Sequence, residues 1–189
     1  QKGKLPIIKY LTSLPDIDLT TKNEENKTYL HLAADSCENE PIINYLLSLN
    51  KIPIDEKDDD GRTILHYLCQ NKSLNLIKNL VKRQELDVTT TDSNGRNILH
   101  IACEAAEDIN IIRFIVSLNK INVNDQDEDG NTALLYLCDN CSSSSEQSQM
   151  VKYFSTLKDV DLTVTNQEGK NCLHLLCGRD NLQLVKHFV

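Results

Sequence analysis

The sequence is poor in glycine and contains no long apolar run, and these absences already narrow the classes of function. Its six glycines form no glycine-rich loop of the kind that holds phosphate groups. No serine lies in the Gly-x-Ser-x-Gly pattern that presents a hydrolase nucleophile. No stretch approaches the roughly 20 apolar residues that a membrane-spanning helix needs. We therefore expect no nucleotide-dependent enzyme, no such hydrolase and no direct membrane insertion.

Positive charge is also scarce. Lys and Arg number 20 against 28 Asp and Glu, which gives a net charge of −8 and a pI near 5.1. Nucleic-acid binding requires the opposite balance, so no nucleic-acid partner is expected. The segment 1–11 shows neither a long apolar run nor a small-residue cleavage site, so we expect no signal peptide and an intracellular, cytoplasmic location.

Repetition is what the chain has in abundance. One nine-residue pattern occurs five times, at intervals of 35, 34, 35 and 39 residues, and its copies open at Asn26, Gly61, Gly95, Gly130 and Gly169. A period of this size predicts a stacked array of similar units instead of one closed core. The function expected of such an array is a long surface that holds a partner.

The second copy shows the structure expected of one unit. The stretch 58–61 is a turn signal, and Gly61 supplies the positive φ that a tight turn needs. The first copy has Asn26 there, and Asn is the non-glycine residue that best tolerates this conformation. Thr63 then opens a short helix with apolar residues at i, i+3 and i+4. A second helix with its own apolar stripe follows at 76–81, and an extended segment, 86–91, leads to the next turn.

The motif Thr-x-Leu-His, followed by x-Ala or x-Leu, resembles the ankyrin repeat, and the resemblance covers the whole chain. Two copies replace the Thr by Asn97 or Asn171, which can still cap a helix start. The position that is proline in the family pattern holds Tyr29, Ile64, Ile98, Ala133 and Cys172. The rival tetratricopeptide hairpin lacks the Asp-x-x-Gly turn. The resemblance implies an all-α repeat solenoid of stacked helix-turn-helix units with β-hairpin-like turns.

The expected organisation is a single array over residues 1–189. Its units are a partial repeat 1–22, repeats 23–57, 58–91, 92–126 and 127–165, and a partial repeat 166–189. Segment 5–11 matches segment 40–46 at an offset of 35, as a second helix without its first. The apolar stripes at the two ends should lack cover, so further repeats of the parent chain are expected at both ends; these stripes are Ile7, Ile8 and Leu11, and Leu184, Val185 and Phe188.

Four of the five histidines occupy one position of the repeat: His31, His66, His100 and His174. Side chains at a regular repeat spacing cannot converge on one metal ion or one catalytic centre. The ankyrin resemblance implies that each imidazole bonds to the backbone near the start of the first helix. The fourth copy has Leu135 there. We expect no catalytic residue, no metal ligand and no cofactor.

Four of the seven cysteines also share one position: Cys69, Cys103, Cys138 and Cys177. The first copy has Ala34 there, so the position should be small and buried. Copies of it in adjacent repeats should lie about 8–10 Å apart, whereas a disulfide needs Cα atoms within about 7 Å. We therefore expect free thiols in a reducing compartment. Cys138-x-x-Cys141 has metal or redox spacing, but no second pair lies nearby, and a chance match is favoured.

Two further motifs leave alternatives open. The run Ser142 to Ser145 predicts a flexible loop, with a regulatory phosphorylation site as the alternative. Asn-x-Ser/Thr sequons begin at Asn26, Asn71 and Asn140, and they are interpreted as coincidental in an Asn-rich chain.

The resemblance also implies a binding face, because ankyrin modules bind through residues that flank the turn glycine and residues that end the first helix. The matching positions here are Glu24, Glu25, Lys27, Asp35, Asp59, Asp60, Arg62, Gln70, Asn94, Arg96, Glu104, Glu128, Asp129, Asn131, Asp139, Glu168, Lys170 and Arg179. Ten are acidic and five basic, a net of −5 out of the chain's −8. This predicts a protein partner with a basic segment, although solvated Asp-rich tips without a binding role are the alternative.

The function expected from all of this is a non-catalytic protein–protein interaction module that binds its partner on the concave face of turns and inner helices. The alternative is a scaffold or targeting segment of a larger multidomain enzyme or effector whose activity lies elsewhere.

Overall fold

The computed structural model describes residues 4–36, 39–83, 86–141, 145–179 and 181–188, and none of these residues is in a strand. The chain divides into two compact units, Gln1–Asp87 and Val88–Val189. The helices of the first unit are α1 (Lys4–Thr12), α2 (Tyr29–Ala34), α3 (Glu40–Ser48), α4 (Ile64–Gln70) and α5 (Leu74–Leu80). Those of the second are α6 (Ile98–Ala105), α7 (Ile109–Ser117), α8 (Ala133–Asp139), α9 (Ser145–Ser155), α10 (Cys172–Gly178) and α11 (Leu182–Phe188).

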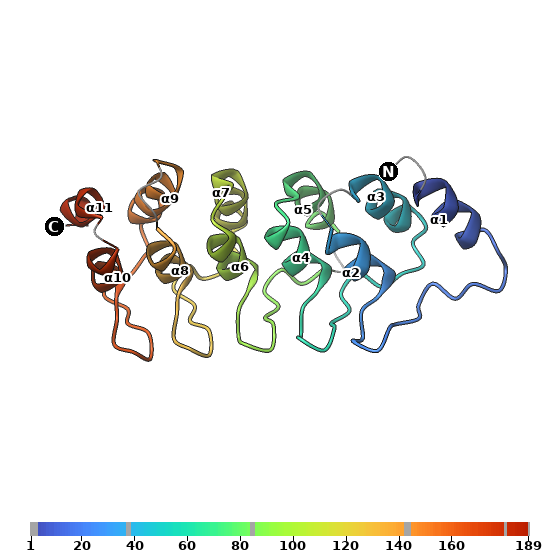
Figure 1. Cartoon of the computed structure of the whole chain (residues 1–189), viewed down its shortest axis with the longest axis horizontal. Coiled ribbons are helices and arrows are strands. Elements are labelled where there is room, and N and C mark those ends of the chain that lie inside the picture. Colours follow the sequence, from blue (N-terminus) through green and yellow to red (C-terminus); the bar gives the residue numbers. More distant parts are fainter. Residues whose placement is uncertain (1–3, 37–38, 84–85, 142–144, 180, 189) are drawn as a thin grey trace. The chain divides into compact units, whose positions relative to one another are not determined.

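Within each unit the helices lie in two rows (Figure 1). In the first unit the first helices α2 and α4 pack on each other, α3 packs on α2, α5 packs on α4, and α1 packs on α3. In the second unit α6, α8 and α10 form a row of first helices, which α7, α9 and α11 accompany as second helices. The predicted all-helical fold of stacked helix pairs is confirmed.

A tight turn precedes each first helix, and its conformation agrees with the sequence pattern. The φ angle is 57° at Asn26 and 71°, 74°, 76° and 72° at Gly61, Gly95, Gly130 and Gly169. In the second copy Asp58 N–H donates to the Arg62 carbonyl at 3.1 Å and Gly61 N–H donates to the Asp58 carbonyl at 3.0 Å. Each turn is thus a short hairpin-like loop without strand structure.

The N-cap residue directly before a first helix is Thr or Asn, and either side chain can accept backbone N–H groups from the first turn of that helix. The Oγ1 of Thr132 accepts the Leu135 N–H at 3.3 Å. The Oδ1 of Asn97 accepts the N–H groups of Leu99 and His100 at 3.0 and 3.2 Å. Because these bonds satisfy N–H groups that a helix start leaves without partners, the Thr-to-Asn replacements preserve the helices.

The first helices are buried more completely than a single apolar stripe would suggest. In α4 every residue from Ile64 to Cys69 is buried, including His66 and Tyr67. Within the first unit α2 and α5 both pack on α4, so the amphipathic pattern at Leu65, Leu68 and Cys69 describes only part of its contacts.

The histidines bond to the backbone of the helix start, as predicted. The Nδ1 atoms of His31, His66 and His100 each accept the N–H of the capping residue at 3.1 Å. A neutral ring whose Nδ1 is an acceptor carries its proton on Nε2, and the Nε2 of His100 lies 2.9 Å from the Asp125 carbonyl oxygen, to which it donates. Burial lowers the pKa of His31 and of His100.

Two expectations about the C-terminal repeat are wrong. Cys177 was expected to be buried like its counterparts, but it is exposed, as is His174. The described residues contain no later first helix that could cover this side of α10. Leu184 was expected to be uncovered, but it is fully buried, because α11 packs on both α9 and α10.

The histidine geometry predicts a loss of stability in mild acid. Protonation of Nδ1 would replace an accepted hydrogen bond by two opposed N–H groups. The folded-state pKa values lie below the ordinary value of 6.5, so the unfolded chain binds protons first and stability falls as pH drops below about 6.5. The midpoint of urea unfolding, followed by circular dichroism, should decrease between pH 7.5 and pH 5.5.

His100→Leu provides the control for this effect, since the fourth copy already carries Leu135 at the equivalent position. This variant should lose part of the pH dependence between pH 7.5 and pH 5.5. If the unfolding midpoint of the unmodified chain does not depend on pH, the histidine rings are not neutral hydrogen-bond acceptors as we infer.

Candidate functional site

The turns of the second, third and fourth copies each begin with an aspartate whose carboxylate stabilises the turn. Asp58, Asp92 and Asp127 are buried. One oxygen of each accepts the N–H of the residue that follows the turn glycine, at 2.8, 2.9 and 2.8 Å. These three acids therefore hold the turn and are not available to a partner.

The second oxygen of each carboxylate also has a partner, which is a tyrosine in the second and fourth copies and an arginine in the third. The hydroxyl of Tyr67 donates to Asp58 Oδ2 at 2.5 Å, and that of Tyr136 donates to Asp127 Oδ2 at 2.6 Å. Burial and this hydrogen bond raise the pKa of Tyr67 to about 12, so its hydroxyl remains a donor at neutral pH. A tyrosine six residues after the turn glycine is the sequence signal that would have revealed this pair.

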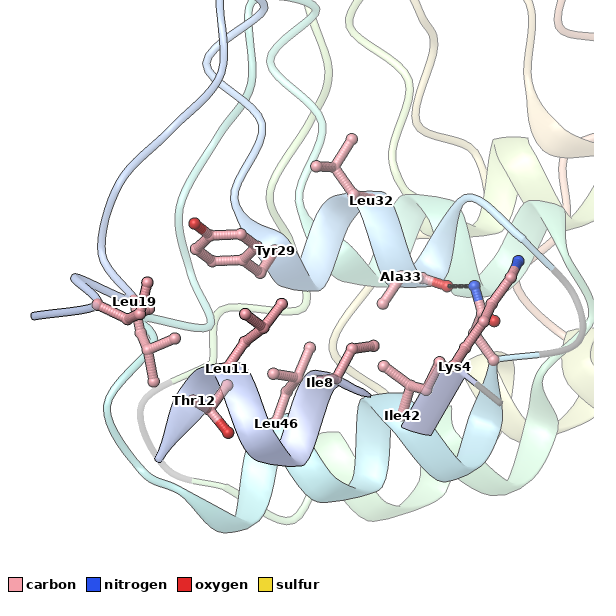
Figure 2. A pocket seen from close by; sticks show the side chains of 12 residues that line it. Lys4, Ile8, Leu11, Thr12, Leu19, Tyr29, Leu32, Ala33, Ile42 and Leu46 are labelled. Atoms are coloured by element: carbon pink, nitrogen blue, oxygen red, sulfur yellow. Dashed lines mark hydrogen bonds between the residues drawn. The ribbon is translucent and has the colours of Figure 1, made fainter. Parts of the chain in front are cut away.

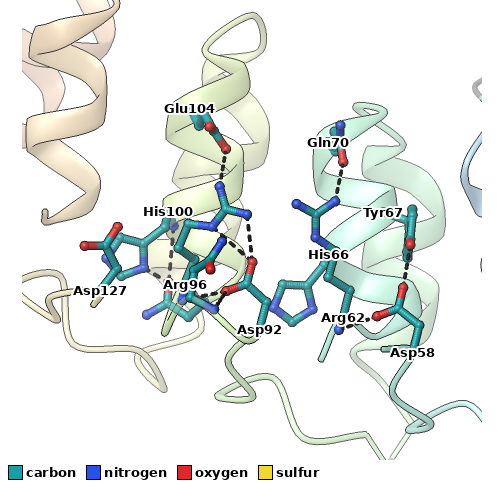
Figure 3. Close-up of polar contacts among 12 residues, drawn as sticks. Asp58, Arg62, His66, Tyr67, Gln70, Asp92, Arg96, His100, Glu104 and Asp127 are labelled. Atoms are coloured by element: carbon teal, nitrogen blue, oxygen red, sulfur yellow. Dashed lines mark hydrogen bonds and ion pairs between the residues drawn. The ribbon is translucent and has the colours of Figure 1, made fainter. Parts of the chain in front are cut away.

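The third copy has Ile101 at the tyrosine position, and Arg96 binds the second oxygen of its carboxylate instead. Its Nε and Nη2 bind Asp92 Oδ2 at 3.0 and 2.9 Å, and its Nη1 binds Glu104 at 3.0 Å (Figure 3). The Arg96 side chain is only 11% exposed. Arg96, predicted as a binding residue, thus stabilises its own repeat.

Other basic residues of the predicted face are also ion-paired within it. Lys27 binds Glu25 at 2.9 Å, Lys170 binds Glu168 at 2.5 Å, and Arg179 binds Asp139 at 3.0 Å. The hydrogen bond to Glu25 raises the pKa of Lys27. These pairs neutralise part of the acidic charge without leaving cations for a partner.

The outer tip acids differ from these pairs. Asp59, Asp60, Glu128 and Asp129 are exposed, and no basic group in the described residues lies within 4.0 Å of their carboxylates. Backbone bonds hold adjacent tips together: Asp59 N–H donates to the Glu25 carbonyl at 3.1 Å, and Glu128 N–H donates to the Asn94 carbonyl at 2.9 Å. The tips therefore present negative charge on a fixed backbone.

The remaining residues of the predicted binding face are either exposed or half-buried. Within the first unit Glu24, Asp35 and Gln70 are exposed and Arg62 is half-buried. Within the second unit Asn94, Glu104 and Asp139 are exposed and Asn131 is half-buried. In the first unit the structure brings together Glu25, Lys27, Asp59 and Asp60, which line one shallow depression with Asp58.

The other motifs have structural explanations where the structure describes them. Two sequon asparagines tie repeats together: Asn71 donates to the Ala34 carbonyl at 2.7 Å and Asn140 donates to the Glu104 carbonyl at 3.3 Å. Cys138 and Cys141 are buried and form no disulfide, and burial raises the pKa of both thiols. The run 142–144 of the serine segment lies outside the described residues, so the choice between loop and phosphorylation site stays open.

No group of three or more His, Cys, Asp or Glu side chains in the described residues is arranged to hold a metal ion. Among the helices of those same residues, none combines the length and the apolar character that a membrane crossing requires.

Because Arg96 is nearly buried and Arg179 is half exposed, we expect their replacement to change the stability of the protein by different amounts. Arg96→Met should lower the free energy of unfolding by about 3 kcal/mol, because Asp92 would keep a buried carboxylate without its guanidinium. Arg179→Met removes a pair that is half exposed and should change stability by less than about 0.5 kcal/mol. Urea unfolding of the two variants measures both values, and equal effects would show that Arg96 is not a framework residue.

The comparisons with known proteins agree with this architecture. A family model described as ankyrin repeats (3 copies) matches residues 1–92 and 68–145. No curated protein matches the sequence. Among solved structures, one similar chain comes from the complex of the Bd0816 predatory endopeptidase from Bdellovibrio bacteriovorus with the immunity protein Bd3460. It is 24% identical, with a TM-score of 0.80, and the match covers 97% of this chain and 91% of that one.

At this identity the structural neighbour supports the fold alone, but the family model covers well over half of the sequence. The chain belongs to the ankyrin repeat family.

Proposed function

We propose that this chain is a non-catalytic binding module whose tips and first helices hold a protein partner with a basic segment. Ankyrin repeats are protein–protein interaction modules, and the similar solved chain comes from a protein–protein complex. The observation that carries the finer proposal is the charge pattern. The basic side chains Lys27, Arg96, Lys170 and Arg179 are paired internally, whereas the outer tip acids are not.

The chemistry of such a face favours long-range attraction over strong individual contacts. Exposed carboxylates in water gain little from any single ion pair. Several of them in fixed positions raise the association rate of a basic partner, and salt weakens this effect. The exposed positions of Asp59, Asp60, Glu128 and Asp129 make them the first groups that an approaching chain would meet.

The proposal includes the organisation and location of the molecule. Residues 1–189 form one array with the repeat boundaries given above, continued by further repeats. Cys69 and Cys138 form no disulfide, which favours a reducing, intracellular compartment. The same face would serve a scaffold or targeting segment of a larger enzyme or effector.

Charge reversal at the tips tests the acidic face. The partner is first isolated by affinity capture with the chain as bait and identified by mass spectrometry. Replacing Asp59, Asp60, Glu128 and Asp129 by Lys should slow its association about tenfold or more at low salt, with a smaller difference at 0.5 M salt. Stopped-flow or biosensor kinetics measure the rate, and circular dichroism checks that the array is folded.

A matched control changes the same number of charges elsewhere. Asp16, Glu40, Glu146 and Asp159 are exposed acids on or after second helices. Their replacement by Lys alters the net charge equally but leaves the tips intact. If both quadruple variants slow association equally, the effect depends on net charge alone and not on the tips. If the tip variant associates as fast as the unmodified chain, the acidic-face proposal is wrong.

A further inference from the structure

The first unit contains two grooves whose linings differ in chemistry. The groove in Figure 2 lies among α1, α2 and α3, has a volume of about 300 Å³, and is lined mostly by apolar side chains such as Ile8, Leu11 and Leu46. The second groove, which we call the Arg83 groove, has a volume of about 780 Å³ and contains charged side chains. It is formed by the end of α3, the loop after α3 and Arg83, which follows α5.

The lining of the Arg83 groove combines buried apolar residues with exposed charged ones. Leu47, Ile52 and Ile54 are buried. Its charged side chains are two cations and one acid, namely Lys51, Arg83 and Asp55. Two positive charges against one negative charge give the lining a net charge of +1, in a chain whose net charge is −8. This balance favours an anionic ligand.

Arg83 is positioned by neutral groups and has no counter-ion. Its Nη1 donates to Asn50 Oδ1 at 3.3 Å, and its Nη2 donates to the Leu47 carbonyl at 3.5 Å. No carboxylate among the described residues lies within 4.0 Å of this guanidinium, whereas Arg96 and Arg179 are each ion-paired. Because a guanidinium has five N–H donors in a planar fork that suits carboxylate and phosphate oxygens, Arg83 can bind a further acceptor.

The stacking of the repeats does not require an arginine at this position. In four other repeats the equivalent residue is leucine: Leu14, Leu49, Leu118 and Leu157. The backbone supports this alignment, since Leu86 N–H donates to the Arg83 carbonyl at 3.3 Å and Val160 N–H donates to the Leu157 carbonyl at 3.4 Å. Arg83 therefore replaces an apolar side chain without gaining an ion pair inside the described part of the protein.

The second unit contains an equivalent groove without the arginine. Its volume is about 340 Å³, and its two charged side chains, Lys158 and Asp159, are of opposite sign. The other lining residues match those of the first groove position by position, with Val116 for Leu47, Asn119 for Asn50, Ile121 for Ile52 and Leu157 for Arg83. The two grooves thus share one backbone frame, and the excess positive charge belongs to the Arg83 groove.

We propose that the Arg83 groove binds a peptide segment that carries an oxyanion, either the carboxylate of an acidic residue or the phosphate of a phosphorylated one. The guanidinium of Arg83 donates to the oxyanion, and the ammonium group of Lys51 adds a second positive charge. The exposed ring of Pro53 contacts an apolar side chain next to the anionic residue. This site shares no residue with the acidic binding face and takes a ligand of the opposite charge.

The size and the lining of the groove favour a peptide over a free anion. Its volume lies within the range of about 300–1,000 Å³ that is typical of ligand sites. An inorganic ion would occupy only the part next to Arg83. A peptide also covers the apolar residues of the lining, and removal of their surface from water adds to the binding free energy.

Arg83→Leu tests the site, because it introduces the residue that four other repeats carry and should leave the fold intact. The probes are the capped tripeptides Leu-Glu-Leu, Leu-phosphoserine-Leu and Leu-Gln-Leu, added at millimolar concentration to isotope-labelled protein. In NMR titrations the anionic peptides should shift the amide signals of segment 47–55, and the neutral peptide should not. Arg83→Leu should weaken the binding of the anionic peptides about tenfold or more, and Arg83→Lys should weaken it less.

Asn50→Asp is a second variant that keeps Arg83 in place. The new carboxylate would replace a side-chain oxygen that already lies 3.3 Å from Arg83 Nη1, so it should neutralise the guanidinium and abolish binding. Circular dichroism checks that each variant is folded. The tighter of the two anionic peptides identifies the oxyanion.

Three results would show that the proposal is wrong. The first is that Arg83→Leu binds the anionic peptides as tightly as the unmodified chain. The second is that neither anionic peptide shifts the signals more than the neutral one. The third is that inorganic phosphate binds as tightly as the phosphorylated peptide, since the groove would then hold a free anion. The acidic-face experiment uses none of these probes, so either proposal can fail while the other stands.

Discussion

A pair of short helices cannot bury its own apolar side chains, and the rest of this structure depends on that constraint. α4 has only seven residues, yet six consecutive ones are buried. Isolated helices of this length are not stable in water, so their order comes from neighbours. Within each unit one helix pair therefore covers another, whereas apolar side chains without such cover, such as Tyr29 and Leu32, are exposed.

Stacking buries polar groups, and the tip carboxylates and the histidine rings among them have hydrogen-bond partners. The buried tip carboxylates bind a backbone N–H with one oxygen and a tyrosine or arginine with the other. The imidazoles accept an N–H from the capping residue. Since an unpaired buried polar group costs about 1–3 kcal/mol, these bonds make the turn and the helix start one rigid element.

The tip acids divide into two groups, and this division supports the proposed binding face. The acids that hold the turn are buried, and the acids next to them are exposed, so framework and recognition are divided between adjacent residues such as Asp58 and Asp59. A partner can therefore bind exposed tip side chains without breaking the bonds that shape the turn. The net charge of the predicted face is negative because it holds ten acidic and five basic residues, and internal ion pairs do not alter that balance.

The sequence by itself determined the local features: the positive φ at Asn26 and Gly61, the Thr and Asn caps, and the histidine bonds. All of these connect residues within about four positions, and repetition made the pattern unmistakable. Only the tertiary structure decided the features that depend on a neighbour. Examples are the pairing of Arg96 with a buried carboxylate, the exposure of Cys177, and the burial of Leu184. Burial and pairing depend on which copy lies alongside, and spacing along one chain does not contain that information.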